Sequence, residues 1–191
     1  MIKFTLDTNC LIAVEDGRAE RSSVLSLIDA QRQEAADLAM VASSAAERQI
    51  GGGALENIEE FRKRMETLGF GGIELLKPIA VWNLSYWDFA IYPSDEAADL
   101  QTEIFSALFP STNPKWPAYA GEKGVDPDDI ESREGWKWRN RFLDAQAMWG
   151  HIFYGRDVFV TSDRNFSKRL SAHSRFRDIE IATPSKAASL L

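Results

Sequence analysis

The sequence predicts an α/β fold of three layers, with helices on both faces of a central, mostly parallel sheet. Short apolar runs of strand length recur along the chain, and most are followed by a segment with the apolar spacing of a helix. Two of these runs end at an acidic residue, Asp7 and Asp163. Parallel strands bring such residues to one edge of a sheet, where ligands collect. The chain has 191 residues, so we expect a single domain over 1–191.

The composition is that of an ordinary globular protein. Charged residues make up 27% and hydrophobic residues 45% of the chain, which excludes disorder and a fibrous repeat. The formal net charge of −7 argues against a general DNA-coating protein. The single cysteine, Cys10, excludes an internal disulfide and a cysteine-based zinc site. Because we find no charged and apolar leader and no apolar run of about 18 residues, we expect a cytoplasmic protein that does not enter a membrane.

The periodicity of the first half predicts alternating strands and helices. The expected elements are a strand at 2–6 that leads into a helix, a helix at 24–34, a strand at 38–42, a helix through 45–47 and a helix at 55–68. Ser22 or Ser23 is placed to cap the second helix. The triple glycine at 51–53 is expected to form a hinge between helices. Segment 69–87 leaves two alternatives, a strand at 73–76 or an irregular loop, because a proline and several aromatic residues interrupt its pattern.

The second half continues the alternation after one long insertion that precedes the longest helix. The expected elements are a strand at 88–92, a helix at 94–108 capped by Ser94, a helix at 136–154 ended by Gly155, a strand at 158–161, a short helix at 166–170, a strand at 179–182 and a final turn or tail at 184–191. Segment 109–135 holds too many prolines and glycines for regular structure. A loop of this length is expected to be functional or mobile, and we predict that it contacts a substrate or partner. Trp116 and Tyr119 lie within it, and their exposure to solvent would support this role.

Asp144 is the most informative acidic residue. On a helix it shares a face with Met148 and Ile152, so it is expected to point into or across the core. A buried carboxylate without a partner is costly, and it normally pairs, shifts its pKa or binds a metal. The alternative is an ion pair with Arg141 on the preceding turn.

The other acidic candidates each have a local alternative. Asp7 and Asp163 are placed to cap the helices that follow them. Glu47 completes a Ser-x-x-Glu capping box with Ser44. Together, however, two acids at strand ends and two on helices predict a convergence at one end of the sheet. Four close carboxylates repel one another unless divalent cations neutralise them.

Four short stretches resemble the motifs of the PIN-domain nuclease family. They are Phe4–Asn9, Ser43–Glu47, Phe142–Ala147 and Val158–Asp163, in the order and spacing of that family. Ribonuclease toxins of toxin–antitoxin pairs are the most similar members. The resemblance covers both ends of the chain and follows the middle only loosely, at 89–108. The chain differs from many members in its greater length, with insertions at about 69–87 and 109–135.

The resemblance implies a site in which carboxylates hold Mg²⁺ or Mn²⁺. Residue by residue, the catalytic and metal-binding positions are Asp7, Glu47, Asp144 and Asp163, and the second-tier polar positions are Asn9, Thr161 and Asn165. Hard divalent cations prefer such oxygen ligands, polarise a phosphate and lower the pKa of a bound water. We therefore expect an endoribonuclease that cleaves single-stranded RNA by attack of water on the phosphodiester. His151 and His173 lie too far from the motifs to act as a catalytic pair without metal.

The expected partners are RNA and, by the resemblance, a small antitoxin protein, and a homodimer is left open. The predicted RNA contacts are Lys137, Arg139, Arg141, Arg164 and Lys168, with Arg169 beside them. Trp136, Trp138 and Phe142 interleave with the first three, which offers cations for phosphate and rings on which bases stack. The alternative is that these aromatic residues belong to the core and the cations to a solvated face.

Two other classes of function are compatible with parts of the pattern. One is a nucleic-acid-binding or assembly module that keeps the fold without cleaving, which the presence of all four acids disfavours. The other is a phosphotransfer or phosphatase domain, which also gathers acids at strand ends. That class requires paired acids or Asp-x-Asp after the first strand, whereas Asp7-Thr8-Asn9 supplies only one acid.

Overall fold

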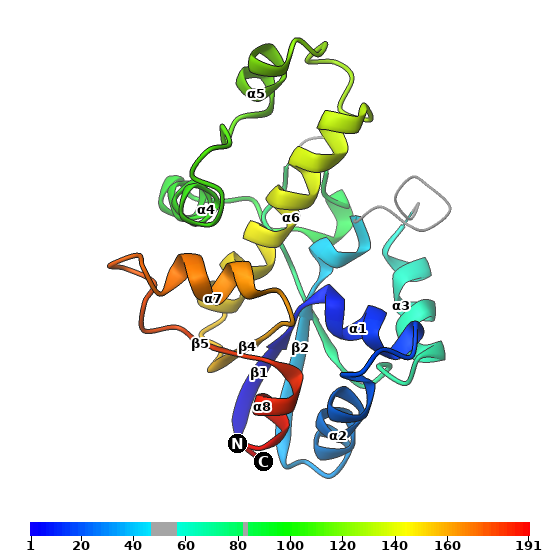
Figure 1. Cartoon of the computed structure of the whole chain (residues 1–191). Helices are drawn as coiled ribbons and strands as arrows, with labels where there is room; N and C mark the ends of the chain where they lie inside the picture. Colours follow the sequence, from blue (N-terminus) through cyan, green and yellow to red (C-terminus); the bar gives the residue numbers. More distant parts are fainter. Residues whose placement is uncertain (47–56, 82–83) are drawn as a thin grey trace.

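The computed structural model describes residues 1–46, 57–81 and 84–191. Its centre is a sheet of five strands in which every neighbouring pair is parallel. In the order β3-β2-β1-β4-β5 across the sheet, the strands are β3 (Glu74–Leu76), β2 (Ala36–Val41), β1 (Ile2–Leu6), β4 (Val158–Val160) and β5 (Glu180–Ala182). The three-layer α/β class expected from the sequence is confirmed (Figure 1).

Alternation along the strands divides the core between the two faces of the sheet. The helices are α1 (Thr8–Glu15), α2 (Arg21–Arg32), α3 (Ile58–Thr67), α4 (Asp95–Leu108), α5 (Trp116–Lys123), α6 (Arg133–Phe153), α7 (Arg164–Leu170) and α8 (Pro184–Ala188). Phe4 and Leu6 of β1 share an apolar cluster with α1, α2, α3 and α8. Phe159 of β4 points to the opposite face and packs with α4, α6 and α7.

The strand order creates a topological switch point between β1 and β4. From β1 the chain proceeds to β2 and β3 on one side, and it returns later to build β4 and β5 on the other. Connections that leave neighbouring strands in opposite directions open a crevice at the carboxyl ends of those strands. Residue Asp7 and segment 161–163 follow directly at these two ends, so the fold itself places them beside one another.

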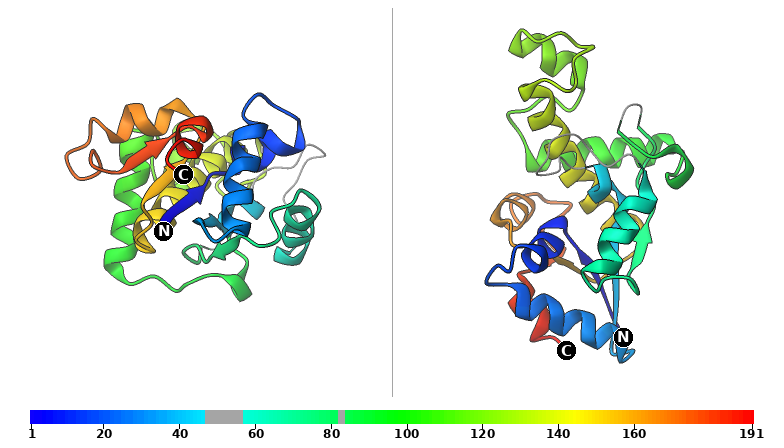
Figure 2. Two further views of the ribbon diagram at one scale, coloured as in Figure 1. Left: turned by 90° about the horizontal axis from the view of Figure 1, so that it is seen from below. Right: turned by 90° about the vertical axis from the view of Figure 1, so that its right-hand side faces the viewer.

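Helix α6 is the long helix expected from the sequence. Ser132 caps its start by accepting a hydrogen bond from Gly135 N (3.1 Å), and Gly155, with φ of +58°, follows its end. Its C-terminal half packs under the sheet, where Gly150 approaches Val41 closely. Its N-terminal half runs past the strand ends and carries α5 (Figures 1 and 2). Within the ranges given above, we find no helix that could cross a membrane.

Segment 109–135 is not the irregular loop expected from its composition. It contains α5, and α6 begins within it. Pro117 stands in the first turn of α5, where proline is tolerated, and Gly124 ends that helix with φ of +64°. Trp116 and Tyr119 are 8% and 3% exposed and pack against α6. The exposed rings that would support a contact role for this segment are therefore not found at Trp116 and Tyr119.

The strand expected at 88–92 is also absent. A 3₁₀ turn, η2 (Trp87–Phe89), stands there, and Ile91 makes only an isolated parallel bridge with Ile79. Segment 69–87 contains β3, which is the first of the two alternatives for that segment.

The local predictions for the first half of the chain are only partly met. Helix α2 begins at Arg21 without a side-chain cap, so Ser22 and Ser23 lie inside it. Strand β2 is followed by the 3₁₀ helix η1 (Ala42–Ala46). The predicted hinge at 51–53 lies outside the described residues.

Candidate functional site

Asp7 is the first residue after β1 and is buried, with 5% of its surface exposed. Its Oδ1 accepts a hydrogen bond from Thr8 N (2.8 Å). Its Oδ2 accepts hydrogen bonds from Thr161 Oγ1 (2.6 Å) and from Asn9 Nδ2 (2.5 Å). Three donors thus hold the carboxylate, and one of them comes from the end of β4.

Asn9 and Thr161 connect the ends of β1 and β4. Asn9 Nδ2 also lies 2.7 Å from Thr161 Oγ1, and Asn9 Oδ1 accepts a hydrogen bond from Ser162 N (3.2 Å). Thr161 Oγ1 in turn accepts one from Asp163 N (3.0 Å). Four of the predicted residues, Asp7, Asn9, Thr161 and Asp163, therefore form one hydrogen-bonded group, which we call the switch-point cluster.

The cluster changes the acidity of Asp7. Burial raises the pKa of this carboxyl from 3.8 to about 6, while the hydrogen bonds from Thr161 and Thr8 oppose the rise and the negative charge of Asp163 adds to it. The two carboxyl groups are therefore close enough to repel each other. A cation bound beside them would favour the charged form of both.

Asp7 and Asp163 also cap helices, as their local alternative predicted, so the same two side chains serve both as caps and as members of the cluster. Asp7 precedes α1, and Asp163 Oδ1 accepts a hydrogen bond from Asn165 N (2.8 Å) at the start of α7. Asp163 is exposed, and its Oδ2 makes no hydrogen bond to the residues that the structure describes. The side chain of Asn165 donates instead to Leu108 O (3.3 Å), so it serves the packing of α7 on α4 rather than the cluster.

Asp144 lies on α6 and is half-buried. His151, two turns later on the same face, has its Nδ1 3.1 Å from Thr5 Oγ1 of β1. Beyond the end of α6, Asp157 accepts a hydrogen bond from Lys3 N at the amino end of β1, so α6 runs antiparallel to the strand. Seven helical residues span about 10 Å, which puts Asp144 on the carboxyl-end side of the sheet. Among the described residues we find no ion pair between Asp144 and Arg141, the expected alternative, and Arg141 donates to Thr112 Oγ1 (2.9 Å).

Glu47, the fourth predicted acid, lies outside the described residues, and so does its capping box with Ser44. The chain leading to it is held at the cluster, because Thr8 Oγ1 donates to Ser44 Oγ (2.7 Å). The sequence analysis named Ser44 only as part of the capping box and did not predict its contact with Thr8. Among the described residues, no three acidic, histidine or cysteine side chains are grouped closely enough to hold a metal ion. Of the four predicted acids, Asp7 and Asp163 are the two that the described residues connect by hydrogen bonds through Thr161.

The three predicted RNA contacts on α6 have different environments. Lys137 pairs with Glu134 (2.5 Å), and Arg141 binds Thr112. Arg139 is buried and stacks over the ring of Trp136, with Cζ 4.7 Å from the ring centroid. The aromatic residues of this stretch are buried as well, so the core alternative holds for the rings and not for all of the cations.

Three cations on α7 are exposed beside the cluster. Arg164, Lys168 and Arg169 form no ion pair with any described acid. A hollow of about 60 Å³ lies between Asp163 and the end of β5, and Ser167 and Thr183 line it together with Arg164. Hydroxyl and guanidinium groups are the usual contacts of nucleic-acid phosphates.

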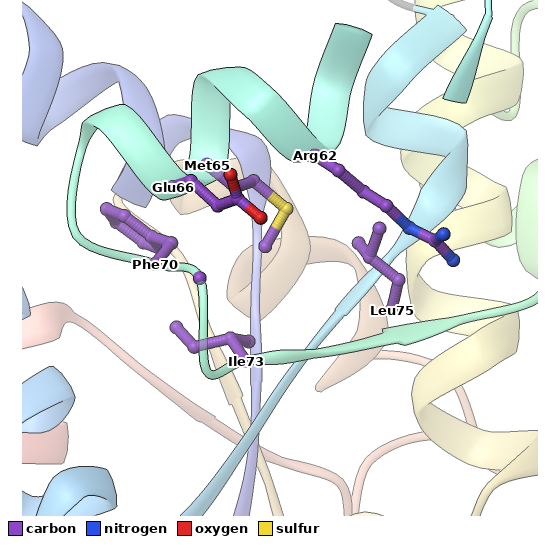
Figure 3. A pocket seen from close by; sticks show the side chains of 7 residues that line it. Arg62, Met65, Glu66, Phe70, Ile73 and Leu75 are labelled. Carbon is purple, nitrogen blue, oxygen red and sulfur yellow. The ribbon is translucent and has the colours of Figure 1, made fainter. Parts of the chain in front are cut away.

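Three larger hollows lie away from the cluster. One, of about 190 Å³, lies between α3 and β3, where Met65, Phe70 and Ile73 converge with Arg62 and Glu66 at its rim (Figure 3). A second, of about 480 Å³, lies between α5 and α6 and is mainly apolar, and Trp138 and Phe142, two of the rings predicted to stack on bases, line it. A third, of about 310 Å³, lies beside His151 and Asp157 at the end of α6.

We compared the chain with models of known protein families, with curated proteins and with solved structures, and none of these comparisons gave a match.

Proposed function

We propose that the protein is a metal-dependent endoribonuclease of PIN-domain type that cleaves single-stranded RNA. The observation that carries the proposal is the switch-point cluster. Its members come from the two ends of the chain, yet Asp7, Asn9, Thr161 and Asp163 meet at the carboxyl edge of a parallel sheet. This edge is where open α/β sheets bind their ligands.

The donor set of the cluster fits a hard divalent cation. Carboxylate, amide and hydroxyl oxygens are the only ligand atoms that Asp7, Asp163, Asn9 and Thr161 offer, and Mg²⁺ is commonly bound through one or two carboxylates while it keeps several waters. We assign Asp7 and Asp163 as the residues that would hold the ion. Asp144 lies on the same side of the sheet, and we assign it and Glu47 to the same site. When bound, the cation would polarise a phosphate and lower the pKa of a water.

The chain contributes orientation and charge to this chemistry. Thr161 and Asn9 hold the carboxylate of Asp7 in one orientation and favour its charged form. Asn9 also fixes the backbone at Ser162, which positions Asp163. The cations of α7 stand beside this pair of acids, where they offset the negative charge of the protein and attract RNA phosphate.

The test is cleavage of a fluorescent single-stranded RNA in Mn²⁺ or Mg²⁺. We expect Asp7→Asn, Asp144→Asn and Asp163→Asn each to lower the rate by about 10- to 100-fold or more, because each removes a negative charge that the ion requires. Asp157→Asn is the matched control, since Asp157 follows α6 at the opposite edge of the sheet. This variant should cleave at the wild-type rate.

The same experiment separates the proposal from its alternative. If wild type binds the RNA and leaves it intact with either metal, the chain is a binding module on this fold. If Asp144→Asn cleaves normally while Asp7→Asn does not, Asp144 belongs to the packing of α6 and not to the site.

A further inference from the structure

Arg139 is a buried cation that forms no ion pair with the residues that the structure describes. Its residue surface is 8% exposed, and its Nε makes no hydrogen bond. No described acid forms an ion pair with it, and no hydrogen bond to its terminal nitrogens is found in the described structure. Burial lowers the pKa of its guanidinium, while the hydroxyl of Tyr86 and the negative charge of Glu131 partly oppose this effect. Burying a charge is costly unless a partner satisfies it, so an arginine in this state is prepared for an anion.

Arg156, a second arginine with a buried side chain, shows how many partners an arginine with a structural role has in this protein. The side chain of Arg156 is 4% exposed, and it donates to both carboxylate oxygens of Asp37 (3.1 Å each). It also donates to the carbonyl oxygens of Asp37 (2.6 Å) and Phe4 (2.8 Å). Arg139 has the ring of Trp136 beneath it, and within the described residues no hydrogen bond to its guanidinium is found. Its polar bonding capacity is therefore unused within the described chain.

A short series of contacts connects Arg139 with the switch-point cluster. Burial raises the pKa of the Tyr86 hydroxyl, and the positive charge of Arg139 nearby partly opposes this rise. The same hydroxyl donates to Ala45 O (3.2 Å). The preceding residue, Ser44, accepts the hydrogen bond from Thr8 beside Asp7. Arg139 thus lies on the β2 side of the cluster. The exposed cations of α7 follow β4, on its other side.

We propose that Arg139 is an anchor for a phosphate of a single-stranded RNA that crosses the switch-point cluster. The inference rests on the proposed function and names how the substrate of that site is held. A guanidinium binds a phosphate in a bidentate manner, and stacking on Trp136 fixes the plane from which it does so. A strand that passes from α7 across the acids to Arg139 places phosphates against cations on both sides of the cluster. This two-sided arrangement favours an extended polyanion over a compact acidic ligand.

The test measures binding in the absence of divalent metal, so that it does not depend on cleavage. The probe is a labelled single-stranded RNA of about 12 nucleotides, followed by fluorescence anisotropy over a range of salt concentrations. Arg139→Met should weaken binding by about tenfold and reduce the salt dependence by about one released ion. Arg32→Met is the matched control, because Arg32 is exposed, is already paired with Asp29, and lies at the end of α2, before β2 begins and thus at the opposite edge of the sheet. It should bind within about twofold of wild type.

Thermal melting supplies a second readout. A structural arginine would lose stability on replacement, whereas removal of an uncompensated buried charge should leave the melting temperature of Arg139→Met equal to or above that of wild type. If Arg139→Met does not fold, Arg139→Lys decides, since lysine keeps the charge but not the bidentate geometry. Several-fold weaker binding by folded Arg139→Lys supports the anchor.

The outcomes are distinct. Wild-type RNA affinity in folded Arg139→Met or Arg139→Lys overturns the anchor and leaves the nuclease proposal standing. Loss of binding to a glutamate-rich peptide, with RNA binding unchanged, also overturns it and assigns the site to an acidic protein partner. If wild type never cleaves but Arg139→Met still binds RNA more weakly, the nuclease proposal fails and the anchor stands.

Discussion

Asp7 combines two properties that usually exclude each other. It accepts three hydrogen bonds, which favour its charged form, and its pKa is nevertheless raised to about 6 because burial outweighs them. The folded protein therefore maintains a carboxylate at neutral pH at a cost in stability. Such a cost is typical of residues selected for a function rather than for the fold.

The destabilising effect of the buried Asp7 carboxylate should appear in the pH dependence of the free energy of unfolding. Between pH 3.8 and about 6 the folded carboxyl binds a proton that the unfolded one has lost, so this group lowers the free energy of unfolding as pH rises through that interval. Asp7→Asn removes the effect. The free energy of unfolding of the variant, relative to wild type, should rise by about 3 kcal/mol between pH 3.5 and pH 7.

Urea unfolding of both proteins at several pH values, without divalent metal, measures this difference. His151, whose pKa burial lowers to about 4, acts in the opposite direction, but it is present in both proteins and cancels. A difference between variant and wild type that stays constant with pH would show that Asp7 does not titrate in this range.

At the scale of elements, α6 is the helix on which the candidate site and the proposed anchor both depend. It carries Asp144 and Arg139, and its distance from the sheet is set where Gly150 lies against Val41 of β2. A Cβ added at Gly150 would lie 2.6 Å from Val41 Cγ2 and 3.2 Å from Val41 Cγ1. Because both valine methyl groups are buried in the sheet, the helix would have to move.

Gly150→Ala should therefore destabilise the protein by about 1–3 kcal/mol, although alanine forms helices better than glycine. Gly121→Ala in α5 is the matched control, because a Cβ there meets no atom within 4 Å, and it should stabilise by up to about 1 kcal/mol. Chemical denaturation of the three proteins measures both effects. Equal stabilisation by the two substitutions would mean that the contact between α6 and β2 is looser than the structure shows.

At the scale of the whole molecule, the protein combines a net charge of −7 with two neighbouring acids at one sheet edge. A cation that binds only the folded state raises its stability by mass action, by about 2.7 kcal/mol at a concentration one hundred times the dissociation constant. In a protein of this size that corresponds to a rise in melting temperature of roughly 5–10 °C.

We expect Mn²⁺ to raise the melting temperature of wild type and of Asp157→Asn by this amount, and that of Asp163→Asn much less. Differential scanning fluorimetry with and without the metal is the measurement. An equal rise in all three proteins would indicate unspecific binding to the acidic surface and would remove the metal from the proposal.

The sequence by itself determined the elements that depend on local patterns. Strands β1, β2 and β4, helices α4 and α6, and the caps at Asp7, Ser94 and Asp163 follow from apolar periodicity and from hydrogen bonds within a few residues. It also singled out Asp7 and Asp163, because polar residues after buried strands meet at one edge of a parallel sheet. The resemblance to the PIN-domain family added Asn9 and Thr161.

The tertiary structure decided what depends on neighbours distant in the chain. The order of the strands put the switch point between β1 and β4, and no local pattern contains that order. Helix α5 exists in spite of its prolines because Trp116 and Tyr119 bury their rings against α6. Lys137, Arg139 and Arg141 look alike in sequence, yet they differ because Glu134, Trp136 and Thr112 lie beside them. Burial and charge compensation are properties of the packed chain, and they distinguish a paired surface cation such as Lys137 from the buried guanidinium of Arg139.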